Sequence, residues 1–242
     1  MPHALLRELT HANRTPAANR RLGGFLAFVA GAVNAGGFVL LEQYTSHMTG
    51  IASVLSLDLA RGAGVEVWVS VLLIIAFTTG AACAAVLIRA ARRAGWHAEY
   101  APCLVIEGAA IAAIAGNIGA WPSVMLLCFS MGLQNAVITK ISRAEIRTTH
   151  VTGMITDLGI GLGRTAWRLA GMEGRGKNNA LSDRSNLRVH ATLLGLFIAG
   201  GTVGTLAFAK LGPSAALMFA TLLWAAALPQ AIRNFGHART AP

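Results

Sequence analysis

The sequence predicts an all-α integral membrane protein with about six transmembrane helices, two short re-entrant segments and two inverted three-span repeats. Three observations support this fold class. Hydrophobic residues make up 55% of the chain and charged residues 12%, whereas a soluble domain usually carries about 25% charged residues. Long apolar runs recur along the chain, and a polar motif occurs twice at matching places within them.

Six apolar runs are long enough to span about 30 Å of hydrocarbon at about 1.5 Å per residue. They cover residues 22–41, 67–88, 101–120, 122–139, 190–209 and 213–232. Two further runs, 50–60 and 151–163, are shorter, and a helix of about eleven residues reaches only about 16 Å. We therefore expect these two segments to enter the membrane and return to the same side.

Polar segments divide the chain into parts. We expect a basic N-terminal segment (1–21), a first repeat (22–120), a second repeat (121–233) and a C-terminal tail (234–242). A long polar stretch inside the second repeat, 164–188, is expected to form a flexible cytoplasmic linker.

The basic residues predict the orientation. With six crossings, all 20 Lys and Arg residues except Arg61 and Lys210 fall on the same side as both termini. Cytoplasmic segments carry the excess of Lys and Arg in membrane proteins, so we expect both termini in the cytoplasm and the protein in the inner membrane of the cell. Eight crossings would leave seven basic residues outside, which fits less well. The net charge of +10 therefore reports orientation and does not indicate a nucleic-acid partner.

The repeat is visible as matched motifs. The first copy consists of Phe28-x-x-Gly31-x-x-Asn34-Ala35 followed by Thr45-Ser46-His47-Met48-Thr49-Gly50. The second consists of Phe129-x-x-Gly132-x-x-Asn135-Ala136 followed by Thr148-Thr149-His150-Val151-Thr152-Gly153. The match continues from Phe77-x-x-Gly80 to Phe197-x-x-Gly200 and from Pro102 to Pro213. Each repeat then holds three spans, and an odd number of spans inverts the second repeat relative to the first.

The duplicated motifs are the predicted solute site. A short helix that begins after such a motif exposes N–H groups that favour an anion or a carbonyl oxygen, and histidine can donate, accept or titrate near neutral pH. The predicted binding or pathway residues are His47, His150, Thr45, Ser46, Thr49, Thr148, Thr149 and Thr152, supported by Asn34, Asn135, Gly50 and Gly153. Polar residues of these types also serve simply as packing contacts between membrane helices, so this alternative stays open.

Acidic residues in apolar runs are a second set of candidates. A charge at the centre of a membrane helix costs roughly 2.5–3.5 kcal/mol on insertion scales, so Glu107 and Asp157 are candidates for proton or ion coupling. Asp58 is expected to form a surface ion pair with Arg61. No catalytic motif and no metal-ligand spacing occurs in the sequence, so we expect no cofactor, no metal and no enzymatic activity.

The first motif carries a family resemblance. Gly31-x-x-Asn34-Ala35, together with Tyr44-Thr45-Ser46-His47-Met48-Thr49-Gly50, resembles the signature of the YoaK-like family of polytopic membrane proteins (domain of unknown function 1275), over about residues 22–233. The resemblance implies about six spans and a bacterial membrane, and it implies no substrate. Family members often continue the motif with Asn, where this chain has Ile51. Aquaporins and formate–nitrite channels offer a fold-level analogy, because they pair inverted three-span repeats with broken or half-helices.

From these patterns we expect a channel or transporter for a small polar or anionic solute. The expected partners are the lipid bilayer and that solute, and a homo-oligomer is compatible with the small-residue pair Gly200 and Gly204. Two alternatives remain. One is a non-catalytic membrane subunit or scaffold that docks a partner through 164–188, and the other is a membrane-embedded enzyme.

Overall fold

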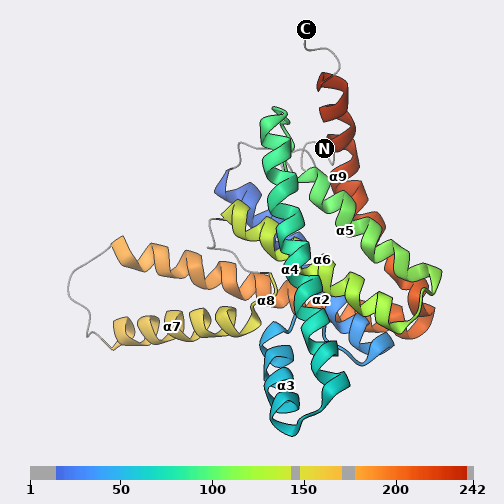
Figure 1. The fold of residues 1–242 in the computed structure, drawn as a ribbon. Helices are drawn as coiled ribbons and strands as arrows, with labels where there is room; N and C mark the ends of the chain where they lie inside the picture. Colours follow the sequence, from blue (N-terminus) through green and yellow to red (C-terminus); the bar gives the residue numbers. More distant parts are fainter. Residues whose placement is uncertain (1–14, 143–147, 171–177, 239–242) are drawn as a thin grey trace.

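The computed structural model describes residues 15–142, 148–170 and 178–238. Within these ranges the chain is built from helices, without a strand (Figure 1). The long helices are α2 (Pro16–Leu41), α3 (Met48–Arg61), α4 (Gly64–Arg93), α5 (Ala101–Ala113), α6 (Ala120–Ser142), α7 (Val151–Leu169), α8 (Asn178–Leu211) and α9 (Ala216–Ala238). Short 3-10 turns, Ile114–Gly116 and Gly212–Ala215, follow α5 and α8. The predicted all-α class is therefore confirmed for the described part of the chain.

Four helical segments among the described residues are long and apolar enough to cross a membrane. They are Ala17–Leu41, Gly64–Arg93, Ala120–Ile141 and Ser185–Ile232, of which the last contains most of α8 and α9. A further apolar helix, Ala101–Gly116, is shorter. The membrane class follows from the length and apolar composition of these helices.

Several predicted boundaries differ from the structure. The run expected at 101–120 forms only α5 and its 3-10 turn, because Asn117 and Gly119 have positive φ angles of 52° and 94° and end the helix. The short segments are longer than expected, since α3 has 14 residues and α7 has 19. Of the expected linker 164–188, residues 164–169 belong to α7 and residues 178–188 belong to α8, and residues 171–177 lie outside the described part of the chain.

The first helix shows how the chain is directed to the motif. Thr15 caps α2, since its hydroxyl accepts a hydrogen bond from the Ala18 N–H at 3.1 Å, and Pro16 suits the first turn, where no backbone donor is needed. The helix ends at Leu41, and the capping residue Glu42 has a left-handed φ of 54° and donates its N–H to the Phe38 carbonyl at 2.9 Å. The chain therefore turns out of α2 immediately before the polar motif.

Two close helix crossings form the centre of the fold. At the α2–α8 crossing, a Cβ on Gly31 would lie 2.0 Å from the Phe197 carbonyl oxygen, and one on Gly200 would lie 1.9 Å from the Phe28 carbonyl oxygen. The α4–α6 crossing repeats this arrangement, with Gly80 against Phe129 at 2.0 Å and Gly132 against Phe77 at 1.9 Å. Only glycine allows such close backbone approach. Each Phe-x-x-Gly motif thus packs against one from the other half of the chain.

Helices α2 and α6, which carry the two copies of the first motif, run in opposite directions. The Asn19 side chain donates to the Ile141 carbonyl at 3.3 Å, and the Gln134 side chain donates to the Leu26 carbonyl at 2.7 Å. The start of α2 therefore lies beside the end of α6, as the ribbon also shows (Figure 1). Residues from both helices belong to one apolar core that also contains α5 and α9.

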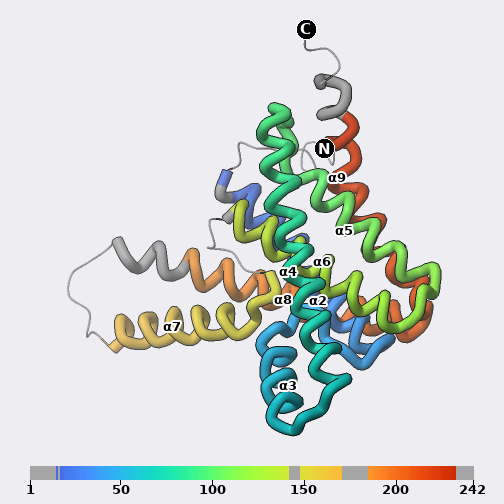
Figure 2. Tube along the Cα trace, in the orientation of Figure 1, coloured from blue at the N-terminus to red at the C-terminus, as the bar shows by residue number. Residues whose placement is uncertain are grey.

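The helices that follow the two polar motifs project from this core. Helix α3 packs along the first part of α4, and α7 packs along the first part of α8, so the trace has two helical arms in different directions (Figure 2). Each polar motif therefore lies at the junction between the core and one arm.

Candidate functional site

The first polar motif is held by Asn34 on α2. The Asn34 side-chain oxygen accepts three hydrogen bonds, from the Thr45 N–H at 3.1 Å, the Ser46 N–H at 3.0 Å and the Ser46 hydroxyl at 2.9 Å. A non-helical segment needs partners for its backbone donors. One amide group therefore orders the segment between α2 and α3.

The second motif has a related arrangement on α6. The Asn135 side-chain oxygen accepts a hydrogen bond from the Thr149 hydroxyl at 2.6 Å, and its amide group donates to the Met131 carbonyl at 2.9 Å. Residues 143–147, which precede this motif, lie outside the described part of the chain. Asn135 thus contacts Thr149 as Asn34 contacts Ser46, although the detailed hydrogen bonds differ.

Each histidine occupies the position immediately before a helix. His47 precedes α3 with φ −90° and ψ 64°, and His150 precedes α7 with φ −85° and ψ 63°. The two copies therefore have nearly the same backbone conformation. Neither imidazole caps the helix that it precedes, which leaves the first N–H groups of α3 and α7 available to other acceptors.

Gly50 makes room for the His47 side chain. A Cβ on Gly50 would lie 2.1 Å from Cδ2 and 2.5 Å from Nε2 of His47. The imidazole therefore lies against the first turn of α3, in a place that a larger residue at position 50 would occupy. Gly50 is one of the residues predicted to support the site, and its lack of a side chain is what leaves room for the His47 ring.

The two motifs meet at one cavity of about 630 Å³, here called the central cavity. It is lined by matched residues from both copies, namely Asn34 and Asn135, Ser46 and Thr149, His47 and His150, Met48 and Val151, Thr49 and Thr152, and Phe77 and Phe197, together with Tyr44 and Gly153. The phenylalanines belong to the second pair of matched motifs. Sequence reasoning noted their spacing but did not place them at the site.

Two of the predicted lining residues lie elsewhere. Thr45 and Thr148 are fully buried and are absent from the cavity lining. Among the described residues, neither hydroxyl has a hydrogen-bond partner. They do not line the cavity, whereas Ser46 and Thr149, one residue later, do.

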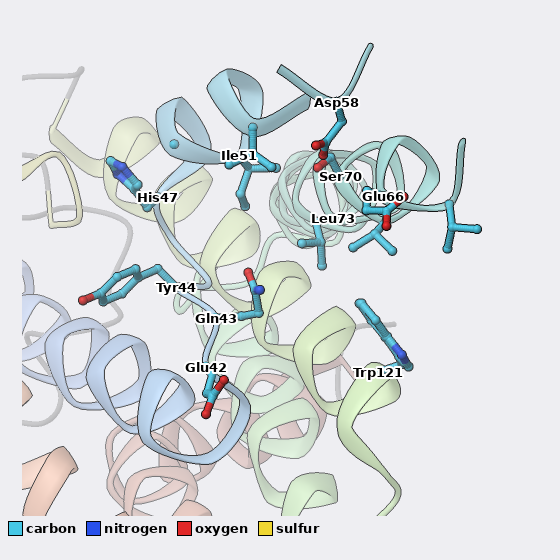
Figure 3. A pocket seen from close by; sticks show the side chains of 14 residues that line it. Glu42, Gln43, Tyr44, His47, Ile51, Asp58, Glu66, Ser70, Leu73 and Trp121 are labelled. Atoms are coloured by element: carbon cyan, nitrogen blue, oxygen red, sulfur yellow. The ribbon is translucent and has the colours of Figure 1, made fainter. Parts of the chain in front are cut away.

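A second cavity of about 580 Å³, here called the outer cavity, adjoins the first. Both cavities share Tyr44 and His47. The outer cavity lies between the motif, α3 and α4, with Trp121 from the start of α6 on its far side (Figure 3). Its lining contains three carboxyl groups, from Glu42, Asp58 and Glu66.

The prediction of a surface ion pair between Asp58 and Arg61 is wrong. Asp58 is only 9% exposed, and among the described residues no basic side chain pairs with it. Its side chain points from α3 toward α4 (Figure 3). Sequence reasoning did not single out Glu42 or Glu66, because each is an ordinary surface residue type at a helix end.

The two remaining acidic candidates lie outside both cavities. Glu107 on α5 is fully buried, and neither carboxyl oxygen has a hydrogen-bond partner among the described residues. Asp157 on α7 pairs with His190 on α8, with 3.3 Å between Oδ2 and Nε2. Within the described ranges, no three His, Cys, Asp or Glu side chains converge to hold a metal ion.

Comparison with known proteins identifies the family of the chain. The family model "Protein of unknown function (DUF1275)" matches residues 22–228, which include both polar motifs. The chain is also 27% identical over 152 residues to the UPF0700 transmembrane protein YoaK of Bacillus subtilis (strain 168), an alignment that covers 60% of this chain and 68% of that relative. No solved structure matches the chain. The resemblance seen in the first motif is thus confirmed, and the protein belongs to the DUF1275 family of transmembrane proteins.

Proposed function

We propose that this protein lets a small polar or anionic solute pass through a bacterial inner membrane by way of the central cavity. The observation that supports this proposal is the convergence of both polar motifs on that one cavity. A packing role would require each motif to bond its own neighbours. It would not require matched His, Thr and Asn residues from two distant segments to face a shared space.

The proposal includes six crossings in two inverted repeats, with both termini in the cytoplasm. The antiparallel course of α2 and α6 supports the inversion, because these helices carry the matched motifs. The Phe-x-x-Gly crossings support it as well, since the first such motif of each repeat meets the second such motif of the other repeat, so the two crossings are equivalent. In this arrangement α3 and α7 enter from opposite faces, and their first turns meet near the middle of the membrane.

The chemistry of the cavity suits a solute with a hydrogen-bond acceptor. Helix N-termini carry free N–H groups and a partial positive charge, and the first turns of α3 and α7 both line the cavity. His47 and His150 can donate to an oxygen or exchange a proton. Hydroxyls from Thr49 and Thr152 supply further donors. Glu107 and Asp157 have no direct part in this path, because they lie away from both cavities.

The test of the proposal is transport by a variant that lacks both imidazoles. Purified protein would be reconstituted into vesicles, and stopped-flow swelling measured with urea, glycerol, formate, acetate and glycine. His47→Ala with His150→Ala should lower the protein-dependent flux at least tenfold. His190→Ala, which removes an imidazole outside both cavities, is the matched control. Normal flux through a correctly folded double variant would refute the proposal.

Accessibility provides a test that needs no knowledge of the solute. Thr49→Cys and Thr152→Cys occupy matched cavity positions and can be compared on a background without Cys83, Cys103 and Cys128. A membrane-impermeant thiol reagent should label Cys at position 49 from outside the cell and Cys at position 152 from the cytoplasm. Absence of labelling at both positions from either side would show that the motifs are packed core.

A further inference from the structure

The outer cavity contains a buried carboxylate that has no charged partner among the described residues. Asp58 is 9% exposed, and no described side chain neutralises it. It also lies in the last turn of α3, where the helix dipole disfavours negative charge. A buried and unpaired charge is costly unless a partner is present. The environment of Asp58 therefore points to a positive group that enters the cavity.

The positions of the other two carboxylates tolerate a negative charge without a bound ligand. Asp58 is therefore the carboxylate that indicates one. Glu66 lies in the first turn of α4, where negative charge is favourable. Glu42 follows α2 and is exposed. In Figure 3 the Asp58 and Glu66 carboxyl groups lie on one side of the cavity, opposite Glu42 and Trp121. All three add negative potential to the same space.

The remaining walls are apolar and aromatic. Ile51, Val54, Val65, Val69 and Leu73 line the cavity beside the aromatic rings of Tyr44 and Trp121. Aromatic faces attract cations, and quaternary ammonium groups are typically recognised by such rings. A metal ion would need several ligands with fixed geometry, and no such group of residues converges in the described part of the chain. A soft organic cation fits these walls better than a metal ion does.

We infer that the outer cavity is a binding site for a small organic ammonium compound, with Asp58 as its counter-ion and Trp121 and Tyr44 as its aromatic walls. The inference rests on the proposed function in one respect, because it takes this cavity, which shares Tyr44 and His47 with the central one, as the entrance to the proposed path. It narrows the solute class. The entrance selects positive charge and the central cavity selects an oxygen acceptor, so the solute carries both groups.

Equilibrium binding to the purified full-length protein in detergent tests the inference. Phenyltrimethylammonium chloride is titrated by isothermal calorimetry at fixed ionic strength, beside sodium benzoate and benzyl alcohol as anionic and neutral compounds of similar size. The wild-type protein should prefer the ammonium compound. Asp58→Asn should weaken its binding about tenfold, whereas Asp157→Asn, an equal change in net charge outside both cavities, should leave binding within about twofold.

A second variant keeps the test decisive if Asp58→Asn does not fold. Trp121 is 56% exposed, so Trp121→Leu should fold and should weaken ammonium binding several-fold. Equal binding of the three compounds, or unchanged binding by Asp58→Asn and Trp121→Leu, would overturn the inference. Because no flux is measured, this result is independent of the His47 and His150 transport test. Ammonium binding without histidine-dependent flux would retain this site and refute only the proposed path.

Discussion

His47 and His150 line the same cavity, and each is the last residue before a helix that projects from the core. Their backbone angles agree within a few degrees. The two residues come from segments far apart in the sequence, so their meeting depends on how α2 and α6 pack. The geometry of the site therefore depends on the helix crossings and on the residues that orient the two motifs.

Substitutions of the glycines at the helix crossings should destabilise the protein more than substitutions elsewhere in the helices. Gly31→Ala or Gly132→Ala would place a methyl group about 2 Å from a backbone carbonyl oxygen on the facing helix. The helices must then separate, and we expect a loss of about 2–4 kcal/mol in the free energy of unfolding. Thermal unfolding in detergent measures this change.

Gly195→Ala is the matched control for the crossing variants. It lies in α8, and no atom lies within 4 Å of a Cβ built at that position. Alanine favours the helical state over glycine, so this variant should be at least as stable as the wild type. Equal melting temperatures for Gly31→Ala and Gly195→Ala would contradict the packing argument.

Gly50→Ala should displace the His47 imidazole without unfolding the protein. The added methyl group would overlap the ring, which can rotate away because it is the far end of a side chain. We expect transport to fall severalfold while the melting temperature stays within a few degrees of wild type. Gly64→Ala, whose Cβ would meet no atom within 4 Å, provides the comparison. Unaltered transport by Gly50→Ala would mean that the position of His47 is unimportant.

Asn34→Ala should loosen the segment that precedes α3. The substitution removes one acceptor and leaves the Thr45 N–H, the Ser46 N–H and the Ser46 hydroxyl without it. Asn34 and its hydrogen bonds are half-buried, so we expect a loss of about 1 kcal/mol in the free energy of unfolding. The amides of residues 45 and 46 should exchange hydrogen faster by mass spectrometry, while the amides of α4 keep their protection. Protection of residues 45 and 46 equal to wild type would contradict the assigned role of Asn34.

Glu107→Met should stabilise the protein. The carboxyl group is fully buried and lacks a hydrogen-bond partner among the described residues, so a side chain of similar size without polar atoms removes a desolvation cost of about 1–3 kcal/mol. The melting temperature should rise, and transport should persist. A stable variant without transport would instead assign Glu107 to ion coupling, as the sequence alone suggested.

Glu99→Gln should have the opposite effect on stability. The Glu99 side chain is 6% exposed and pairs with Arg92 through two nitrogen–oxygen contacts, one of them 2.9 Å between Nη2 and Oε1. Removing this carboxylate breaks a charge-assisted hydrogen bond at the α4–α5 connection, and we expect a loss of about 1–2 kcal/mol. An unchanged melting temperature would show that the pair is too exposed at Arg92 to contribute.

Much of the fold could be predicted because the length and apolarity of a local stretch of sequence identify a membrane helix. Length and apolarity identified α2, α4, α6 and the α8–α9 region as membrane segments. Boundaries were less predictable where composition is mixed. Helix α7 extends to Leu169 beyond its apolar part because it packs along α8: a Cβ on Gly161 would lie 3.0 Å from Leu187 Cδ1, and Asp157 pairs with His190.

The site could be predicted in part. The repeated motif identified the residue types, but Thr45 and Thr148 look the same in sequence as Ser46 and Thr149, and only one residue of each pair faces the cavity. Which one does so depends on the turn that Asn34 or Asn135 imposes. Sequence reasoning also missed the outer cavity, because its carboxylates come from three separate helix ends and carry no common spacing.

By itself the sequence determined the membrane class, the duplicated motifs and the family, since these depend on composition and local order. The tertiary structure alone decided that both motifs line one cavity, that the first Phe-x-x-Gly of each half packs against the second of the other half, and that Asp58 is buried and unpaired with Arg61. The physical reason is the same in each case. Helix rotation and crossing are set by contacts between distant segments, and a linear sequence does not show which of these contacts form.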